Sequence, residues 1–474
     1  MKDRNVRKHV SPLDVATGSR LDIFARTDFV LSTVTGLGKS WSLQLYQSYL
    51  NAAGVSANDK EDDKESIVDY ISSFNELIDS MINFGFDEQK GLIPVCDRGI
   101  VNGAHRVATA LVLDHNIVVQ KNDDPASIID YRWLEKSRLH QDYINHMAFE
   151  LLRHKANARA YVMFDIENHL CDKLENQIRN HSDVVIRRRI LLTDVGKRRI
   201  ISLLYDYNEW WRADLLEQFV IERFDKNENT VDIIFTLENN FSDRQTRKED
   251  LRSMLTNDIF ERKIHGTDDH FDTLWLAESV LNVNSIAFLN CSPIGSEDEL
   301  LRRIGKPLQN SHTNRLIGDW CIDGSAVLEL HGLRPANDID YIYYGQNLAP
   351  VNVLRNGDCH NSHYDLNSVP LDEILFNPRM HFYFKGIKFI SLSMLLQQKF
   401  EANSENSLTD CHLILKSRSN IPSLYFNKDA RKLAFRVKLM TKITRRVDRW
   451  LRKLPNKVEM YLRKFINSTK DFLA

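Results

Sequence analysis

The spacing of apolar residues changes several times along the chain, and each spacing predicts one kind of element. Apolar residues alternate or form short runs at 159–166 (RAYVMFDI), 183–193 (DVVIRRRILLT) and 231–238 (VDIIFTLE), which is typical of sheet strands. Between these segments, 171–181 and 197–211 repeat apolar residues at helical spacing. This order predicts an α+β unit in which strands and helices follow one another as β-α-β-β-α-β.

A second predicted unit contains the string IPVCDRGIVNGAHRVATALVLDHNI at 93–117. Its pattern predicts a strand, a turn, a second strand and then a helix, with Gly103 and Ala104 at the strand-to-helix turn. His105 and Arg106 then fall in the first helical turn, where the helix end and an arginine stabilise a bound anion. We expect a nucleotide phosphate here; the alternative is that both side chains only cap the helix.

This turn resembles the phosphate-binding turn of the ParB–sulfiredoxin fold family, and 81–103 resembles the helix, strand and strand that precede it. Gly103, His105 and Arg106 carry the match. Sulfiredoxins have a cysteine just before the His-Arg pair, whereas this chain has Ala104, which excludes sulfinic-acid reduction. The resemblance implies nucleotide binding and raises small-molecule kinase activity as a further expectation.

The string ERKIHGTDDHF at 261–271 places His265 where a strand or loop gives way to a helix. Asp269 and Asp272 favour the positive end of a helix, and 272–281 has helical apolar spacing. A histidine on such a turn can contact a phosphate, although a surface histidine beside a helix cap has the same local sequence.

The letters IHGTD around His265 resemble the catalytic string of nucleoside diphosphate kinases, in which the histidine accepts a phosphoryl group. Arg252 precedes His265 at the family's spacing, since 265 − 252 = 13. Tyr205 matches the family's base-proximal tyrosine, and Arg244 and Arg247 fall in the family's order in a loop after the third strand. The resemblance implies a ferredoxin-like domain that carries a phosphohistidine.

The same resemblance assigns further roles and shows departures. Arginines would offset the charge on the phosphate oxygens, and Thr267 would help to hold the imidazole ring. The family's lysine-proline-aspartate string is replaced by FDI at 164–166, and Glu278 lies two residues later than the family's orienting glutamate. The domain is therefore expected either to transfer phosphate to another acceptor or to have lost catalysis.

A third predicted unit begins at 316–345, where the pattern indicates a strand, a Gly324-Ser325 turn, a helix and a second strand. Asp338 and Asp340 are two residues apart, so on a strand both side chains point to one face. Two carboxylates beside such a turn suit Mg²⁺ (or Mn²⁺) ions that bind a triphosphate during nucleotidyl transfer. The alternative is a solvated strand that happens to carry two acids.

These residues look like the minimal nucleotidyltransferase signature of the DNA polymerase β-like superfamily, Gly-Ser followed by Asp-x-Asp. Downstream, 376–401 predicts a strand ending at Lys388 and then a helix bearing Lys399, similar to related stand-alone proteins. The resemblance implies that both lysines bind phosphate. The family's third carboxylate has two candidates in this chain, Asp365 and Asp372.

Composition limits the classes of protein to which the chain can belong. With 474 residues, 43% of them hydrophobic, it can bury the cores of two to four domains. A formal net charge of −2 argues against nucleic-acid binding by bulk charge, and six cysteines without paired spacing argue against a disulfide framework or zinc site. Without a signal peptide or a run of about 18 apolar residues, we expect a cytoplasmic protein.

The predicted units and connections cover most of the chain. They are a ParB/sulfiredoxin-like domain at 10–130, a helical linker at 131–157, an NDP-kinase-like domain at 158–291, a nucleotidyltransferase domain at 310–425 and a basic amphipathic helix at 428–466. Within 428–464, 14 Lys and Arg against three acids give a charge of +11. Such a helix binds an anionic membrane surface, an acidic partner or, as a weaker expectation, RNA; a helix solvated on one face is the alternative.

Together the three resemblances predict a phosphotransferase and nucleotidyltransferase that uses ATP or another nucleoside triphosphate with Mg²⁺. The expected acceptor is a small metabolite or sugar-like molecule, in a setting such as bacterial surface-polysaccharide synthesis at the inner face of the membrane. A nucleotidyltransferase toxin or defence enzyme that modifies tRNA or protein is an alternative, as is a non-catalytic nucleotide-binding scaffold.

Overall fold

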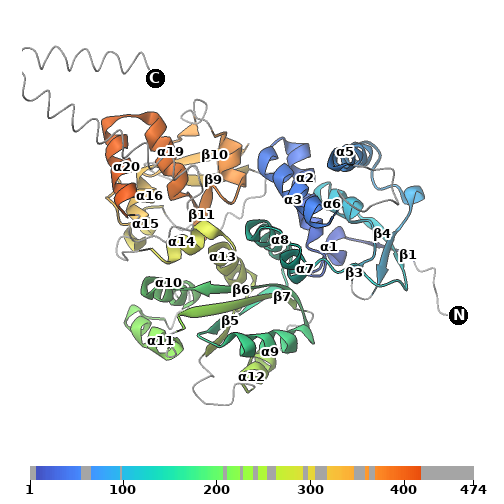
Figure 1. The fold of residues 1–474 in the computed structure, drawn as a ribbon, viewed down its shortest axis with the longest axis horizontal. Coiled ribbons are helices and arrows are strands. Elements are labelled where there is room, and N and C mark those ends of the chain that lie inside the picture. Colours follow the sequence, from blue (N-terminus) through green and yellow to red (C-terminus); the bar gives the residue numbers. More distant parts are fainter. Residues whose placement is uncertain are drawn as a thin grey trace, which may run out of the picture. The chain divides into compact units, whose positions relative to one another are not determined.

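Three four-stranded sheets, each with its own helices, account for much of the described chain in the computed structural model (Figure 1). The structure describes residues 7–54, 66–96, 99–205, 211–224, 228–238, 244–253, 263–291, 297–304, 318–345, 358–361 and 369–417. The chain forms two compact units, Met1–Ser391 and Leu392–Ala474, and all three sheets belong to the first. The prediction of an α+β fold is confirmed.

The first sheet has the strand order β1-β4-β2-β3. Its strands are β1 (Arg7–Val10), β4 (Ile117–Lys121), β2 (Ile93–Cys96) and β3 (Gly99–Ile100), with β2 and β4 parallel and the other pairs antiparallel. Helix α6 (Ala104–Val112) follows β3 through Gly103, whose φ of 92° is left-handed. The predicted order of strand, strand and helix is confirmed, and the predicted turn at 97–98 lies outside the described residues.

Helices surround this sheet and continue beyond it. They are α1 (Pro12–Val15), α2 (Asp22–Thr35), α3 (Lys39–Ala52), α5 (Ile67–Phe84), the 3₁₀ turn η1 (Glu88–Lys90), α7 (Tyr131–Lys136) and α8 (Gln141–His154). Helix α2 packs against α3, α6 and α8. The segment predicted as a helical linker therefore contains two helices, α7 and α8.

The second sheet is antiparallel throughout and has the order β6-β7-β5-β8. Its strands are β5 (Ala158–Phe164), β6 (Ser182–Leu191), β7 (Thr230–Glu238) and β8 (Ile264–Gly266). Every side chain of β5 is buried, which is why its sequence is apolar apart from Arg159 rather than an alternation of apolar and polar residues. Numbered along the chain, the four strands lie in the order 2-3-1-4.

Helices connect and follow these four strands. They are α9 (Asn168–Arg179), α10 (Asp194–Tyr205), the 3₁₀ turn η2 (Ala213–Leu215), α11 (Leu216–Arg223), α12 (Arg244–Ser253), α13 (His270–Val280) and α14 (Val283–Leu289). Helices α10 and α11, which follow β6 and precede β7 along the chain, pack against each other. Helix α13 begins where the acids after His265 predicted a helix start, because Asp269 caps it through the Asp272 N–H.

The third sheet has the order β10-β9-β12-β11. Its strands are β9 (Gly318–Asp323), β10 (Asp340–Gly345), β11 (His381–Phe384) and β12 (Ile387–Ile390), and its helices are α15 (Glu297–Ile304), α16 (Ser325–Leu330) and α18 (Leu371–Phe376). A single strand ending at Lys388 was predicted, but the structure has a hairpin of β11 and β12. Lys385 and Gly386 both have positive φ, 48° and 74°, which suits a two-residue hairpin turn.

The two faces of the third sheet differ in polarity. Strand alternation places Asp319, Cys321 and Asp323 on one face, and the cross-strand pairs add Asp340 and Lys388 to it. The opposite face is apolar, with Trp320, Ile322, Phe382 and Phe389 buried and Phe288 of α14 stacked on Phe382. The Asp340 carboxylate therefore projects from the polar face of this sheet.

The second unit contains two described helices, α19 (Leu392–Ala402) and α20 (Glu405–Ser417). Lys399 of α19 lies 3.4 Å from the carboxylate of Asp410 on α20, so the lysine pairs within this unit. The predicted basic helix at 428–466 lies outside the described residues.

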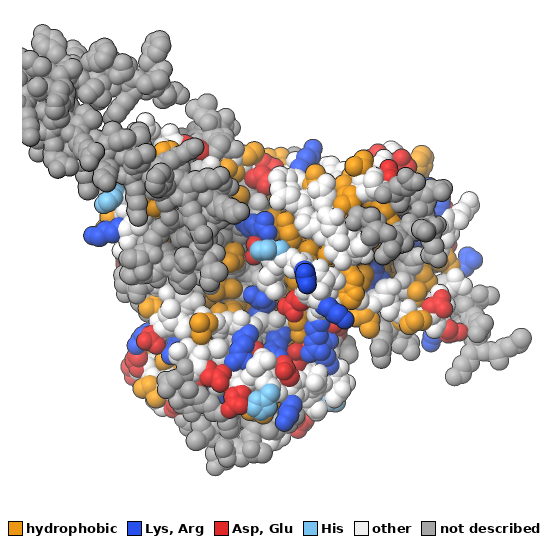
Figure 2. Space-filling view, in the orientation of Figure 1, with side chains coloured by type: hydrophobic (Ala, Val, Ile, Leu, Met, Phe, Trp, Pro, Cys, Tyr) orange, Lys and Arg blue, Asp and Glu red, His pale blue; other side chains and the backbone are white. Residues whose placement is uncertain are grey.

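Figure 2 shows acidic and basic side chains interspersed over the second-sheet region on the face in view. Within the described ranges, no helix is long and apolar enough to cross a membrane. All six cysteines are free thiols.

Candidate functional site

The Gly324-Ser325 turn and the two predicted aspartates meet at the end of β9. Gly324 has a φ of 66°, and a Cβ built on it would lie 2.4 Å from Oδ2 of Asp340. A side chain at this position is therefore excluded both by the left-handed backbone and by the close approach of a carboxylate. Ser325 Oγ lies 3.2 Å from Oδ1 of Asp338. The four residues of the predicted motif are thus brought together.

The two aspartates nevertheless differ in setting. Strand β10 begins at Asp340, which is buried, whereas Asp338 precedes the strand in a bend and is exposed. The expectation that both lie on one strand is wrong for Asp338, which precedes the strand and contacts Ser325. The site therefore combines one fixed, buried carboxylate with one that is open to solvent.

Two further residues of this site were missed by the sequence analysis. Asp323 is opposite Asp340 in the β9–β10 ladder, is fully buried and accepts a 2.6 Å hydrogen bond from the Gly324 N–H. His360 lies against both carboxylates: its Nδ1 is 3.4 Å from Asp323 Oδ2, and its Nε2 is 3.3 Å from Asp340 Oδ1. Strand alternation from Asp319 could have indicated Asp323, but no spacing in the sequence indicates His360.

Backbone pairing carries His360 to the site. Residues 358–361 run along β10, where the Tyr341 N–H donates to Asp358 O at 3.1 Å and the His360 N–H donates to Tyr341 O at 2.8 Å. The side chain of Asn361 bonds both the N–H and the carbonyl of Tyr343, at 2.9 and 2.7 Å. His360 is therefore held from both sides by fixed groups.

Other residues predicted for this site are engaged elsewhere. Lys388 is buried on the polar face, where it pairs with Asp319 and donates to Leu375 O at 3.0 Å. Asp372 accepts a 2.8 Å hydrogen bond from the Gly38 N–H at the start of α3. Asp365 lies outside the described residues.

The Lys388 side chain lines a small polar cavity of about 60 Å³ between α8, α13 and the third sheet. Glu150 and Arg153 form an ion pair in its wall at 2.6 Å, and the buried side chain of Glu278 also lines it. Burial would raise the pKa of Glu150, but Arg153 holds that pKa below its usual range. The volume suits a few water molecules and is far too small for a nucleotide.

A second group of predicted residues meets at β8. His265 Nδ1 lies 3.1 Å from the hydroxyl of Tyr205, and Arg223 Nη2 donates to the same hydroxyl at 3.0 Å. Burial raises the pKa of Tyr205, and Arg223 partly offsets that rise. The predicted pair His265 and Tyr205 is therefore brought together, and Arg223, which no motif indicated, completes the chain of contacts.

The other predicted residues of this domain have different partners. Arg252 donates to the carbonyl of Ile264 at 3.0 Å, one residue before His265. Thr267 accepts from the Ala160 N–H at 2.9 Å and lies 2.8 Å from the Thr273 hydroxyl, so it joins β5 to α13.

Arg244 and Arg247, predicted in a loop, lie on α12; their side chains lie outside the described part. Among the described residues, Tyr205 is the side chain shown to hold the His265 ring.

The predicted phosphate turn of the first sheet is closely packed. His105 Nε2 is 2.7 Å from the Tyr46 hydroxyl, and the ring of Phe74 lies edge-on to it at 4.5 Å. Arg106 donates to the carbonyls of Gly91 and Leu92, and burial lowers its pKa. These contacts join the start of α6 to α3, α5 and the segment before β2, and within the described part of the chain no side-chain hydrogen bond caps α6, so the capping alternative is not supported either.

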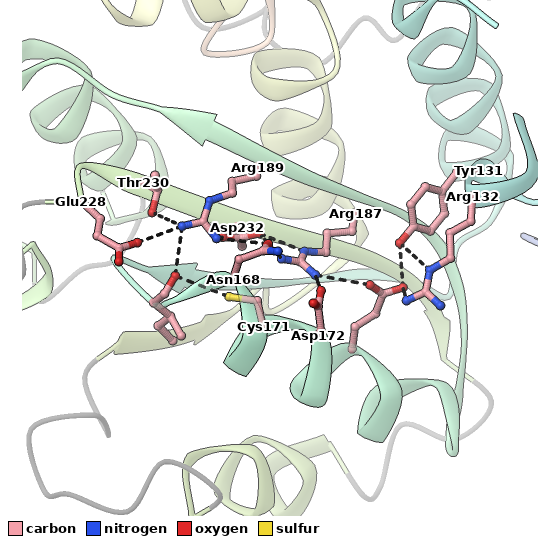
Figure 3. Close-up of polar contacts among 12 residues, drawn as sticks. Tyr131, Arg132, Asn168, Cys171, Asp172, Arg187, Arg189, Glu228, Thr230 and Asp232 are labelled. Atoms are coloured by element: carbon pink, nitrogen blue, oxygen red, sulfur yellow. Dashed lines mark hydrogen bonds and ion pairs between the residues drawn. The ribbon is translucent and has the colours of Figure 1, made fainter. Parts of the chain in front are cut away.

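Arginines of β6 form a separate charged groove with α7 and α9 (Figure 3). Arg187 donates to Asp232 at 2.9 Å and also bonds Asp172, while Arg189 reaches Glu228 at 2.9 Å. Burial raises the pKa of Asp232, and Arg187 partly offsets the rise. Because carboxylates pair with Arg187 and Arg189, the groove is an ion-pair network that joins elements of the fold.

Comparisons with family models, curated proteins and solved structures give no match for this chain.

Proposed function

We propose that the third sheet carries a nucleotidyl-transfer site, in which Asp338 and Asp340 act beside the Gly324-Ser325 turn. The observation that carries the proposal is the close approach of Asp340 to Gly324, with Ser325 in contact with Asp338. Residues 13 and 16 positions apart in the sequence are thus in close contact, which supports the arrangement that the minimal nucleotidyltransferase signature implies.

The donor set fits a hard divalent cation. Carboxylate oxygens are the ligands that Mg²⁺ and Mn²⁺ take from proteins, and Mg²⁺ sites usually combine one or two carboxylates with substrate phosphates and water. Within the described ranges, no group of three or more His, Cys, Asp and Glu side chains is arranged to enclose an ion by itself. Asp338 and Asp340 would therefore share the cation with the triphosphate.

Each residue has a definite part in the proposed reaction. The Ser325 hydroxyl would bind a phosphate oxygen, and the absence of a side chain at Gly324 lets the triphosphate approach the backbone. An acceptor oxygen forms a bond to the α-phosphorus while the bond to the bridging oxygen breaks, and diphosphate leaves with that electron pair. The bound cation would offset the charge that develops on the phosphate oxygens.

A second phosphate site at His265 is favoured by its contact with Tyr205 and Arg223. The strand order 2-3-1-4, with a helical pair between the second and third strands, is the order expected for a ferredoxin-like, NDP-kinase-like domain. A phosphoryl transfer there would prepare the phosphate that attacks the α-phosphorus at the third sheet. The acceptor proposed for both steps is a small metabolite or sugar-like molecule.

The test uses the full chain with nucleoside triphosphates radiolabelled at the α-phosphorus, together with Mg²⁺ or Mn²⁺. Label transfer to a small acceptor supports the proposal, transfer to tRNA or protein supports the toxin alternative, and binding without transfer supports the scaffold.

The double variant Asp338→Asn/Asp340→Asn should lose transfer, whereas Asp358→Asn, an exposed aspartate on the neighbouring segment, should retain it. Unchanged transfer in the double variant would remove the assignment. Label from the γ-phosphorus tests the second site, because an acid-labile phosphoprotein should disappear in His265→Asn.

A further inference from the structure

His360 joins the carboxylates of the third sheet in an arrangement that is typical of metal-binding histidines. One ring nitrogen, Nδ1, faces the buried carboxylate of Asp323 at 3.4 Å, and the other, Nε2, faces Asp340 at 3.3 Å. Metal-ligating histidines commonly donate the other ring N–H to a carboxylate, which fixes both the tautomer and the ring orientation.

We propose that His360 Nε2 is a ligand of the divalent cation at this site, positioned by Asp323, and that it gives the site a preference for transition-metal ions over Mg²⁺. The proposal rests on the proposed nucleotidyl-transfer function and specifies its metal. Asp340 and His360 would be the fixed protein donors, and exposed Asp338 would complete the set with the triphosphate.

Asp323 is suited to the positioning role. It is fully buried at the end of β9, and its Oδ1 already accepts the Gly324 N–H, which directs Oδ2 toward His360. A carboxylate that accepts the Nδ1 proton leaves the lone pair on Nε2, the nitrogen that faces Asp340.

The separation of the two donor atoms fits a shared ion. Neighbouring ligands on an octahedral ion, each at about 2.1 Å, lie about 3 Å apart. The 3.3 Å between His360 Nε2 and Asp340 Oδ1 differs from that spacing by only a few tenths of an ångström. The spacing of the two atoms is therefore compatible with one ion bound by both.

The chain also fixes His360 against Asp340, where it adds an imidazole to the proposed donors. Residues 358–361 pair with β10, on the side of that strand away from β9, and two backbone hydrogen bonds fix the position of His360. Of the two candidates for the family's third carboxylate, Asp372 is held at the start of α3. An imidazole binds transition-metal ions well, whereas Mg²⁺ strongly prefers oxygen.

The test measures metal binding to the full chain without nucleotide, with Mn²⁺ as the probe. Electron paramagnetic resonance of the bound ion should show a nitrogen hyperfine coupling in the wild-type protein, and Mg²⁺ should compete weakly. His360→Gln should lose the coupling and weaken Mn²⁺ binding at least tenfold. His360→Asp should shift the preference toward Mg²⁺, and His412→Gln, which replaces an exposed histidine of α20, should change nothing.

Asp323→Asn provides the readout for the positioning role, because it should weaken Mn²⁺ binding while keeping the nitrogen coupling. Bound Mn²⁺ without nitrogen coupling in the wild-type protein would overturn the inference. If binding is also lost in Asp340→Asn, the proposed site stands and only the role of His360 fails. If Mn²⁺ binding survives in both Asp340→Asn and His360→Gln, the proposed function fails as well.

Discussion

Glu175 of α9 joins helix α7 to the second sheet, and its replacement by glutamine gives a quantitative test of that role. Its side chain is 1% exposed and accepts the Tyr131 hydroxyl at 2.7 Å, and it pairs with Arg132 at 2.7 Å and Arg179 at 2.8 Å. Figure 3 shows Tyr131 and Arg132 at one end of this network and Arg187 within it. Burial would raise the pKa of Glu175, but Tyr131 and the arginines hold it below its usual range.

The expected loss of stability in Glu175→Gln depends on how well water can solvate the partners of Glu175 after the change. Removing one partner of a buried ion pair costs ~3–5 kcal/mol when the other charge stays buried. Here the Arg132 and Arg179 side chains are 45% and 27% exposed, so water can solvate both after the change. Glutamine also keeps an acceptor for Tyr131. We therefore expect Glu175→Gln to lower the free energy of unfolding by about 2–3 kcal/mol.

The assay is urea denaturation of the full chain, compared with Glu217→Gln as a matched control. Glu217 makes two hydrogen bonds to Arg198, at 2.6 and 3.1 Å, but its side chain is 60% exposed. Exposed pairs contribute about 0–1 kcal/mol, so the control should stay close to wild type. Equal losses in the two variants, or a loss below about 1 kcal/mol for Glu175→Gln, would refute the argument from burial.

Three further changes test other parts of the structure. Burial, with a smaller contribution from Arg199, lowers the pKa of His331 to about 3, so the unfolded chain binds an extra proton below about pH 6.5. The wild-type protein should therefore lose about 2 kcal/mol of stability between pH 7 and 5 in urea titrations, a loss that His331→Gln lacks; parallel curves would contradict this. Gly324→Ala should reduce α-label transfer at least about 100-fold and also lower the thermal midpoint, because its Cβ strains the backbone at a φ of 66° and displaces the buried Asp340 carboxylate; full activity would argue against the close approach. Lys388→Met should cost ~3–5 kcal/mol in urea by leaving Asp319 buried, and adding Asp319→Leu should restore much of it; an equally unstable double variant would contradict the pairing.

Local patterns in the sequence predicted much of this structure. The run at 159–166 indicated a sheet strand, and β5 occupies most of that segment. The Gly324-Ser325 turn, with Asp340 entering a strand, followed from spacing alone, because a strand, a turn and a helix each leave a signal within a few residues. The contact of His265 with Tyr205 joins residues 60 positions apart; the family resemblance assigned both residues to one site but did not predict the contact.

Long-range packing decided the features that were missed. His360 reaches Asp340 through a backbone bridge that no local pattern encodes, and Asp372 was unavailable because α3 binds it. Lys388 was assigned to phosphate, yet Asp319, 69 positions away, pairs with it on the same face. These contacts depend on which helices and strands become neighbours in the fold, and the side-chain chemistry of a short stretch of sequence does not determine which elements become neighbours.

The most direct test of the central claim is a crystal structure of the full chain with Mn²⁺ and a nucleoside triphosphate whose α,β-bridging oxygen is replaced by methylene. The account predicts an anomalous manganese peak between Asp338 and Asp340, with the triphosphate on the Gly324-Ser325 turn. Nucleotide and manganese bound elsewhere, with both carboxylates free of metal, would contradict it.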